Sequence, residues 1–373
     1  MNALGIIFTD SFDTNMEEYV ERRTLASLPY GGRYRLVDFP LSNMANAGVK
    51  NIGIITRMNY QSLAQHLRSG ADWDLSRKFN GITLLPPYST QWAQAEFYEN
   101  RLEGLIANIP YLRFAEEKYV IIAGCHQIWN EDLDDFVKKH IESGAKLSVM
   151  YADKVLNHQE EIDATYIKVD EEGAVTGQRV EKTKPRGYSY SLNTYCIERE
   201  LLISLIEKAQ RDGKKSFRRD VIRTLIEQGQ VVGYEAKGIV LAIENPTSYL
   251  ESSLALLESD VREALFGNEN NPIITPARDS APTKYGEEAV VANSFIADGV
   301  VIEGEVRNSV IFRGATIEKG AVVENSVVMQ DTVVSENARI NYCVLDKDVL
   351  IEKGRWLSGY ITHPFYVKRN SRI

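Results

Sequence analysis

Short apolar segments alternate with amphipathic segments over the longer, N-terminal part of the chain. Apolar runs bounded by polar residues are typical of buried strands in a parallel sheet. They occupy residues 3–8, 51–56, 119–123 and 146–151. Between them, apolar side chains recur at three- and four-residue intervals, which predicts amphipathic helices. These stretches are 15–23, 63–67, 98–109 (ended by Pro110) and 133–141. The alternation predicts an α/β domain with a mostly parallel sheet and right-handed crossovers.

The pattern continues to residue 258 and then changes. A hairpin is predicted for residues 164–180 and a strand for 231–234. Further helical stretches are 201–206, 221–226 and 249–257. The run Gly-Asn-Glu-Asn-Asn-Pro and two later prolines are typical of a linker. We therefore predict a first domain at 1–258, a linker at 259–282 and a second domain at 283–373.

A six-residue repeat dominates the second domain. The aliphatic positions are Ile296, Ile302, Ile311, Ile317, Val323, Val328, Val334, Ile340, Leu345 and Ile351. An Asn-Ser pair recurs at 293, 308 and 325, about one coil apart. Hexapeptide periodicity predicts a parallel β-helix with three flat sides per turn and stacked aliphatic side chains inside. The alternative is an ordinary antiparallel β-domain. Because a β-helix has flat sides and an unpaired end, we expect it to contact other subunits.

Acyl transfer is not expected from this repeat. Hexapeptide acyltransferases use a histidine on such coils, whereas the only histidine after His158 is His363, beyond the last repeat.

Composition excludes several other classes. The 373 residues carry a formal net charge of −9 and no basic run, so nucleic acid is not an expected partner. The three cysteines are scattered, which indicates free thiols in a reducing cytoplasm rather than a zinc site or a disulfide framework. The apolar run at 4–8 is too short for a signal peptide or a membrane span. We expect a cytoplasmic protein that does not contact a membrane.

Residues with special backbone roles concentrate at 29–48, Pro-Tyr-Gly-Gly-Arg-Tyr-Arg-Leu-Val-Asp-Phe-Pro-Leu-Ser-Asn-Met-Ala-Asn-Ala-Gly. The two glycines permit a positive φ or a close approach. Pro40 is expected to end the segment before it. Arg33 and Arg35 place two guanidinium groups beside this turn, a common way to hold phosphate. The alternative is a structural turn with solvated arginines.

This stretch closely resembles the block G-G-K-Y-R-L-I-D-F-P-L-S-N-x-x-N-S-G of glucose-1-phosphate adenylyltransferases, the ADP-glucose pyrophosphorylases of glycogen and starch synthesis. The resemblance extends, more weakly, over nearly the whole chain. It implies a Rossmann-like nucleotidyltransferase α/β domain followed by a left-handed parallel β-helix, in agreement with the two-part pattern.

The resemblance also implies a glycine-rich loop, A-G-G-x-G-x-R-L, that holds the triphosphate with its backbone amides. Aligned from the 29–48 block, the two leading glycines become Asp10 and Ser11. The third glycine becomes Asp13, and the arginine becomes Asn15. Two carboxylates would repel a polyphosphate, and the added Cβ atoms would block close approach.

The other nucleotide and metal motifs are altered as well. Leu25 stands for the lysine of R-A-K-P-A, and Trp92–Glu96 stands for G-T-A-D-A. Cys125 stands for the metal aspartate of G-D-H, and Ala242 for the aspartate of W-x-D-V-G-T. Magnesium prefers oxygen ligands, which neither residue supplies. We therefore expect no catalytic residue, metal or cofactor on this chain, and assign the reaction's Mg²⁺ to a catalytic partner subunit.

The sugar-phosphate motifs resemble those of the family more closely than the nucleotide and metal motifs do. Glu181-Lys182-Thr-Lys184-Pro resembles F-x-E-K-P, and the extra residue leaves open whether Lys182 or Lys184 faces the phosphate. Ser191 stands for the serine of S-M-G, and Asp220 for the last aspartate of D-F-G-x-D. The alternative for both lysines and Asp220 is solvated surface charge.

Together, the resemblance implies the noncatalytic, regulatory-type second subunit that Gram-positive bacteria make beside a catalytic one. The expected partner is that catalytic subunit in a heterotetramer, with a homo-oligomer as another possibility. Two rival functions remain, an active enzyme with a rebuilt nucleotide site and a free-standing sugar-phosphate sensor.

The resemblance assigns an effector site as well. Arg33 occupies a position where the family has a basic residue linked to sugar-phosphate activation, so we expect a phosphorylated sugar to bind there. We expect Arg35 to face the opposite side and to be structural.

Overall fold

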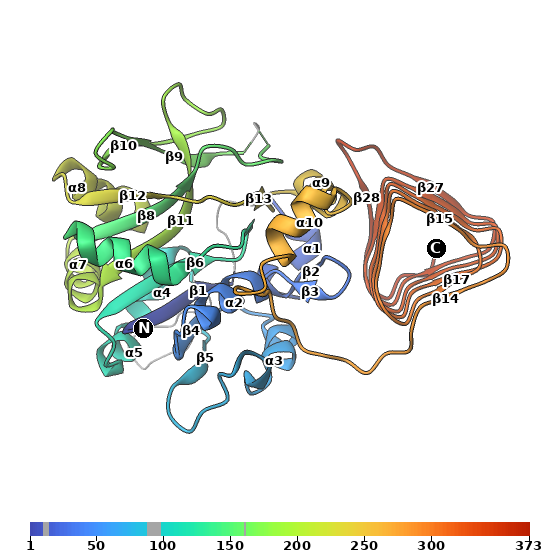
Figure 1. Ribbon diagram of the computed structural model, residues 1–373, viewed down its shortest axis with the longest axis horizontal. Coiled ribbons are helices and arrows are strands. Elements are labelled where there is room, and N and C mark those ends of the chain that lie inside the picture. The colour runs from blue at the N-terminus through green and yellow to red at the C-terminus, as the bar shows by residue number, and fades with distance from the viewer. Residues whose placement is uncertain (10–14, 88–97, 160–161) are drawn as a thin grey trace.

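The computed structural model describes residues 1–9, 15–87, 98–159 and 162–373 (Figure 1). An α/β domain lies at one end of the molecule, and a triangular parallel β-helix lies at the other. The predicted fold class is therefore confirmed. Within the described ranges, no helix is long and apolar enough to cross a membrane.

A mixed sheet forms the centre of the α/β domain. Its strands, in sheet order, are β10 (Val175–Glu181), β9 (Ala164–Val169), β11 (Ser189–Glu198), β6 (Tyr119–Gly124), β1 (Ala3–Phe8), β4 (Asn51–Ile55) and β5 (Gly81–Leu85), with β8 (Leu147–Ala152) between β11 and β12 (Val231–Glu235). The predicted central strands β1, β4 and β6 are parallel neighbours. β11 is antiparallel to both β6 and β8 and was not predicted, because serine, asparagine and threonine interrupt its apolar pattern.

Helices cover the sheet. They are α1 (Glu17–Val20), α2 (Asp38–Asn46), α3 (Gln61–Leu67), α4 (Arg101–Ala107), α5 (Ile109–Phe114), α6 (Leu133–Ser143), α7 (Arg199–Arg211), α8 (Arg223–Glu227), α9 (Pro246–Ala255) and α10 (Ser259–Phe266), with shorter helical turns at Leu25–Ser27, Ala71–Trp73 and Phe217–Ile222. α6 shows how the local sequence determines where a helix begins and ends. The Asp132 side chain accepts hydrogen bonds from the first backbone N–H groups, and Gly144 closes the helix with φ 64°.

Two proline predictions were wrong. Pro110 does not end the preceding helix, since α4 already ends at Ala107, and it lies in the first turn of α5. Pro40 likewise lies in the first turn of α2. The first turn of a helix leaves backbone N–H groups without intrahelical partners, so the missing proline N–H costs nothing there.

Three five-stranded parallel sheets form the β-helix. The first holds β14 (Lys284–Tyr285), β17 (Val301–Ile302), β20 (Thr316–Ile317), β23 (Val333–Val334) and β26 (Leu350–Ile351). The second holds β15 (Val290–Ala292), β18 (Glu305–Arg307), β21 (Val322–Glu324), β24 (Arg339–Asn341) and β27 (Trp356–Ser358). The third holds β16 (Phe295–Ile296), β19 (Val310–Ile311), β22 (Val327–Val328), β25 (Cys343–Leu345) and β28 (Phe365–Val367). Nearly all the predicted repeat positions are buried in one core.

The recurring Asn-Ser pairs have a geometric cause. Asn293, Asn308 and Asn325 adopt left-handed backbone conformations, with φ between 42° and 48°, at one corner of successive coils. Asparagine tolerates this conformation better than most residues. Their side-chain amides also bond from coil to coil, at 2.9 Å from Asn293 to Asn308 and 3.4 Å from Asn308 to Asn325.

The stretch between the two domains is not entirely irregular. Residues 259–266 of the expected linker form α10, which buries Val261 and Leu265 in the large α/β core. The chain then runs without helix or strand from 267 to 283 before the first coil begins.

Candidate functional site

The described residues that were aligned with the family's nucleotide and metal motifs lie in different surroundings. Leu25, Cys125 and Ala242 are buried in the protein. Asn15 is exposed, and its backbone N–H donates to the Glu244 carbonyl at 2.7 Å. Asp10, Ser11, Asp13 and residues 92–96 lie outside the described ranges.

The surroundings of Ala242 do not suit a metal ion. β13 (Leu241–Ala242) pairs antiparallel with β7 (Gln127–Ile128). The Asn157 side chain binds both backbone groups of Ala242, accepting from its N–H at 2.8 Å and donating to its carbonyl at 2.7 Å. The part of the chain that the structure describes contains no group of three His, Cys, Asp or Glu side chains able to hold a metal. The side chains at the two aligned metal positions are a methyl group in Ala242 and a thiol in Cys125, and neither is a ligand that magnesium prefers.

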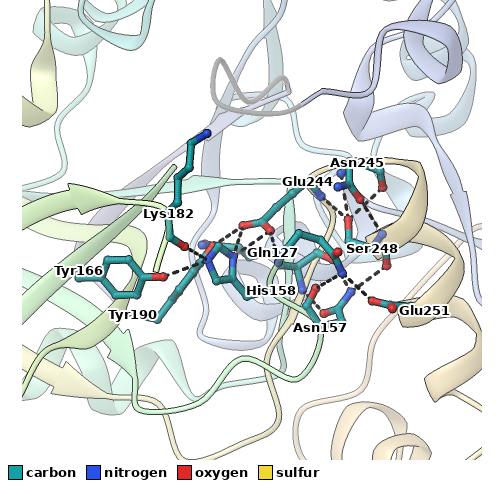
Figure 2. Close-up of polar contacts among 12 residues, drawn as sticks. Gln127, Asn157, His158, Tyr166, Lys182, Tyr190, Glu244, Asn245, Ser248 and Glu251 are labelled. Carbon is teal, nitrogen blue, oxygen red and sulfur yellow. Dashed lines mark hydrogen bonds and ion pairs between the residues drawn. The ribbon is translucent and has the colours of Figure 1, made fainter. Parts of the chain in front are cut away.

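A buried carboxylate lies two residues beyond Ala242 (Figure 2). Glu244 is only 3% exposed. Its oxygens lie 2.9 and 3.0 Å from His158 Nδ1, and they accept from the Tyr190 hydroxyl at 2.9 Å and the Gln159 backbone N–H at 3.2 Å. Burial and then the charge of Glu244 raise the pKa of Tyr190, so this hydroxyl stays protonated and donates. The buried carboxylate is thus surrounded by hydrogen-bonding groups.

His158 extends this cluster toward the expected sugar-phosphate segment. Its Nε2 lies 2.9 Å from the Tyr166 hydroxyl and 3.3 Å from the Lys182 carbonyl oxygen. We did not predict either Glu244 or His158. The signal for Glu244 was present in the motif comparison, since it stands at the glycine of W-x-D-V-G-T in an otherwise apolar stretch.

Only two of the five predicted sugar-phosphate residues meet this cluster. Lys182 joins it through its carbonyl, while its ammonium points away (Figure 2). Ser191 is buried on β11 next to Tyr190, and its carbonyl is 3.4 Å from Gln127 Nε2.

The remaining three have other partners. Lys184 binds the Asp153 carbonyl and carboxylate at 2.6 Å, and Glu181 pairs with Arg179 at 3.3 Å. Asp220 accepts from the Ser216 N–H at 2.9 Å, as a local helix-end contact.

A second site lies between the two domains. This pocket, about 100 Å³ in volume, is here called the cationic pocket. It is lined by Arg33, Arg35, Gln65, His66, Arg68, Thr275, Pro276, Arg278, Arg313, Gln330 and Lys347. No Asp or Glu is among these lining residues, so the pocket concentrates positive charge where the α/β domain, the linker and the β-helix meet.

The pKa of Lys347 reflects the burial and the positive charge at the cationic pocket. Burial, followed by repulsion from Arg35 and Arg23, lowers the pKa of Lys347 to about 7. The neighbouring Asp346 carboxylate raises the pKa of Lys347 and so offsets part of this effect, but Arg23 and the Tyr366 hydroxyl also bind it. A phosphate entering the pocket would relieve this repulsion.

Arg35 corrects one prediction. It lines the same pocket as Arg33 rather than the opposite face, because residues two apart in an extended segment share a face. It also has the expected structural role, since its guanidinium donates to the Ser62 carbonyl at 2.6 Å and hydroxyl at 2.9 Å.

The glycine turn beside Arg33 is part of the domain contact. Gly31 and Gly32 have φ values of 54° and 75° and connect β2 (Pro29–Tyr30) to β3 (Tyr34–Arg35). A Cβ on Gly32 would lie 3.4 Å from the Ala297 Cβ on the β-helix. The turn therefore sits directly against the β-helix, which fixes Arg33 at the domain boundary.

Comparison with known proteins assigns each domain to a family. Residues 22–258 match the nucleotidyl transferase family. Residues 276–358 match the GlmU-like C-terminal hexapeptide family, in agreement with the expected β-helix.

Relatives that align with most of this chain narrow the family assignment. The glycogen biosynthesis protein GlgD of Geobacillus stearothermophilus is 34% identical, covering 84% of this chain and 80% of the relative. GlgD of Bacillus subtilis (strain 168) is 29% identical, covering 98% and 95%. The glucose-1-phosphate adenylyltransferase of Bacillus mycoides (strain KBAB4) is 30% identical, covering 88% and 87%. The chain therefore belongs to the nucleotidyl transferase family, in the group of the glycogen biosynthesis protein GlgD and the glucose-1-phosphate adenylyltransferases.

Proposed function

We propose that this chain is a noncatalytic, regulatory subunit of glucose-1-phosphate adenylyltransferase in glycogen biosynthesis. A catalytic paralogue in the same heterotetramer converts ATP and glucose 1-phosphate to ADP-glucose and pyrophosphate, using its own Mg²⁺. This chain modulates the rate of that partner.

The noncatalytic part of the proposal rests on the two positions that align with the family's metal ligands. Cys125 and Ala242 are both buried, and hydrogen bonds to Asn157 fix the backbone of Ala242. Adenylyl transfer needs a cation to neutralise the phosphates, and Leu25 cannot replace it with a positive charge.

The test is an ATP-dependent assay of the isolated chain with glucose 1-phosphate and Mg²⁺. We expect no turnover above background, and none for Cys125→Asp, because Leu25 and Ala242 remain. Turnover by the isolated wild-type chain would instead support an active enzyme with a rebuilt site.

The regulatory part rests on the cationic pocket. Its cations would attract phosphate groups, and its walls come from both domains, so a ligand there would favour one domain arrangement. We propose a phosphorylated sugar as the effector, with Arg33 as one of its contacts.

Arg33→Ala should therefore lower the effector response of the mixed enzyme. The matched control is Arg223→Ala on α8, which removes an exposed arginine at the end of the α/β domain far from the β-helix (Figure 1). If Arg33→Ala leaves the effector response intact, Arg33 has only a structural role in the glycine turn.

Large exposed side chains on the last coil support subunit contact through the β-helix. Trp356 is 76% exposed and Tyr360 75%. Replacing both by serine should weaken co-elution with the catalytic subunit on a sizing column. Phe79→Ser, which removes an equally exposed ring from the α/β domain, is the control. Failure of the wild-type chain to co-purify with any catalytic subunit would favour a free-standing sensor or a homo-oligomer.

A further inference from the structure

Glu244 connects segments that lie far apart in the sequence. Its carbonyl accepts from Asn15, where the expected phosphate loop ends. Its carboxylate binds His158 and the Tyr190 hydroxyl on β11. His158 in turn reaches the carbonyl of Lys182 in the segment that resembles F-x-E-K-P. Hydrogen bonds within one chain thus join the stretches that match three different ligand motifs.

The groups around the Glu244 carboxylate are those that would hold a bound anion. The Tyr190 hydroxyl and the Gln159 backbone N–H donate to it, and His158 Nδ1 lies within hydrogen-bond distance. The residue replaces a glycine of the matching motif, so its side chain fills a volume that the motif leaves open. A buried carboxylate is tolerated only where such partners surround it.

We propose that Glu244 is a built-in substitute for the phosphate group of a sugar phosphate. It occupies the place of that phosphate group and connects the surrounding segments through His158, Tyr190 and Gln159. The inference rests on the proposed function, in which this site has no catalytic task. It adds that a sugar phosphate acting on this chain does not enter the former substrate site.

Removing the carboxylate should convert the cluster into a receptor for an outside anion. In Glu244→Gly, the Tyr190 hydroxyl, the Gln159 N–H and the His158 ring would face a vacant space. Glu244→Gln is the matched control, because its amide fills the same volume and still accepts one hydrogen bond.

Hydrogen exchange read by mass spectrometry tests both parts. Without ligand, amide exchange in segments 162–169 and 182–191 should be at least about tenfold faster in Glu244→Gly than in wild type, as expected when charged hydrogen bonds are lost. Millimolar glucose 1-phosphate should restore protection in these segments in Glu244→Gly. It should leave them unchanged in wild type and Glu244→Gln, and glucose without phosphate should have no effect on any of the three.

Two results would overturn the proposal. One is protection of 182–191 by glucose 1-phosphate in the wild-type chain, which would show an open site. The other is a folded Glu244→Gly protein whose segments do not respond to glucose 1-phosphate. If Glu244→Gly does not fold, Glu244→Ala also removes the carboxylate, and the same two results decide.

The proposed function has a separate readout in this experiment. Ligand bound in the cationic pocket would protect segments 31–36 and 65–68, which contain lining residues of the pocket, rather than 182–191. Failure of the effector proposal and failure of the Glu244 proposal are therefore distinguishable.

Discussion

A buried ion pair between Arg23 and Asp346 joins the two domains, and Asp346→Asn removes its negative charge. Asp346 is 1% exposed and Arg23 is 9% exposed. The Asp346 carboxylate also accepts from the Tyr366 hydroxyl at 2.6 Å and the Lys347 N–H at 2.7 Å. Tyr366 stacks on Tyr19 of α1 with ring centroids 4.1 Å apart. Arg23 and Tyr19 belong to the α/β domain, and the other three residues to the β-helix.

The size of the effect follows from this geometry. Removing one partner of a buried ion pair costs about 3–5 kcal/mol, because the other charge is left buried without compensation. The asparagine still accepts one hydrogen bond, so we expect the lower end, about 3 kcal/mol. At about 2–4 °C per kcal/mol, the melting temperature should fall by about 6–12 °C.

Differential scanning calorimetry measures this shift directly. Asp348→Asn is the matched control, because it removes the same charge from an exposed site, where Asp348 pairs with Arg369. An exposed ion pair contributes at most about 1 kcal/mol, so its shift should be small. Equal melting temperatures for the two variants would refute the claim that the Arg23–Asp346 pair stabilises the contact between the domains.

Two further predictions concern pH. Since Lys347 has a pKa of about 7 in the folded chain, its charge and hence sulfate binding to the cationic pocket should decline as pH rises from 6 to 8.5, and Lys347→Arg should remove this decline in a calorimetric titration. An equally steep decline in Lys347→Arg would disprove the assignment. Burial lowers the pKa of His140 to about 4 and, with nearby arginines, that of His126 to about 3. The histidines of the unfolded chain take up protons at a higher pH than these two buried histidines, so the urea midpoint of unfolding should fall as pH decreases from 6.5 to 4. The fall should be less steep in His140→Gln. A midpoint that stays constant over this pH range would contradict the buried neutral state of the two histidines.

The sequence was sufficient for the architecture wherever its periodicity was regular. The six-residue repeat predicted the β-helix core, and apolar runs predicted β1, β4 and β6. β11 was missed because Ser191, Asn193 and Thr194 are buried by a mixed sheet, in which polar side chains find hydrogen-bond partners that no periodicity reveals.

The candidate sites were harder to predict from the sequence than the fold was. Motif comparison found the altered positions Leu25, Cys125 and Ala242, and the structure adds that all three are buried. The cationic pocket could not be assembled from sequence, because its cations come from the α/β domain, the linker and two different coils of the β-helix. The Glu244 cluster was missed for a related reason, since His158 lies 86 residues from Glu244 along the chain.

The central claim is that this chain regulates a catalytic subunit without catalysing. The most direct measurement is the initial rate of ADP-glucose formation by a purified catalytic paralogue, alone and with a stoichiometric amount of this chain. Titration with a phosphorylated sugar effector should accompany each rate. We predict that the chain, inactive alone, changes the rate or the effector response of the paralogue, and that Arg33→Ala reduces that change. A paralogue whose rate and effector response are the same with and without this chain, under conditions where the two co-elute, would contradict the account.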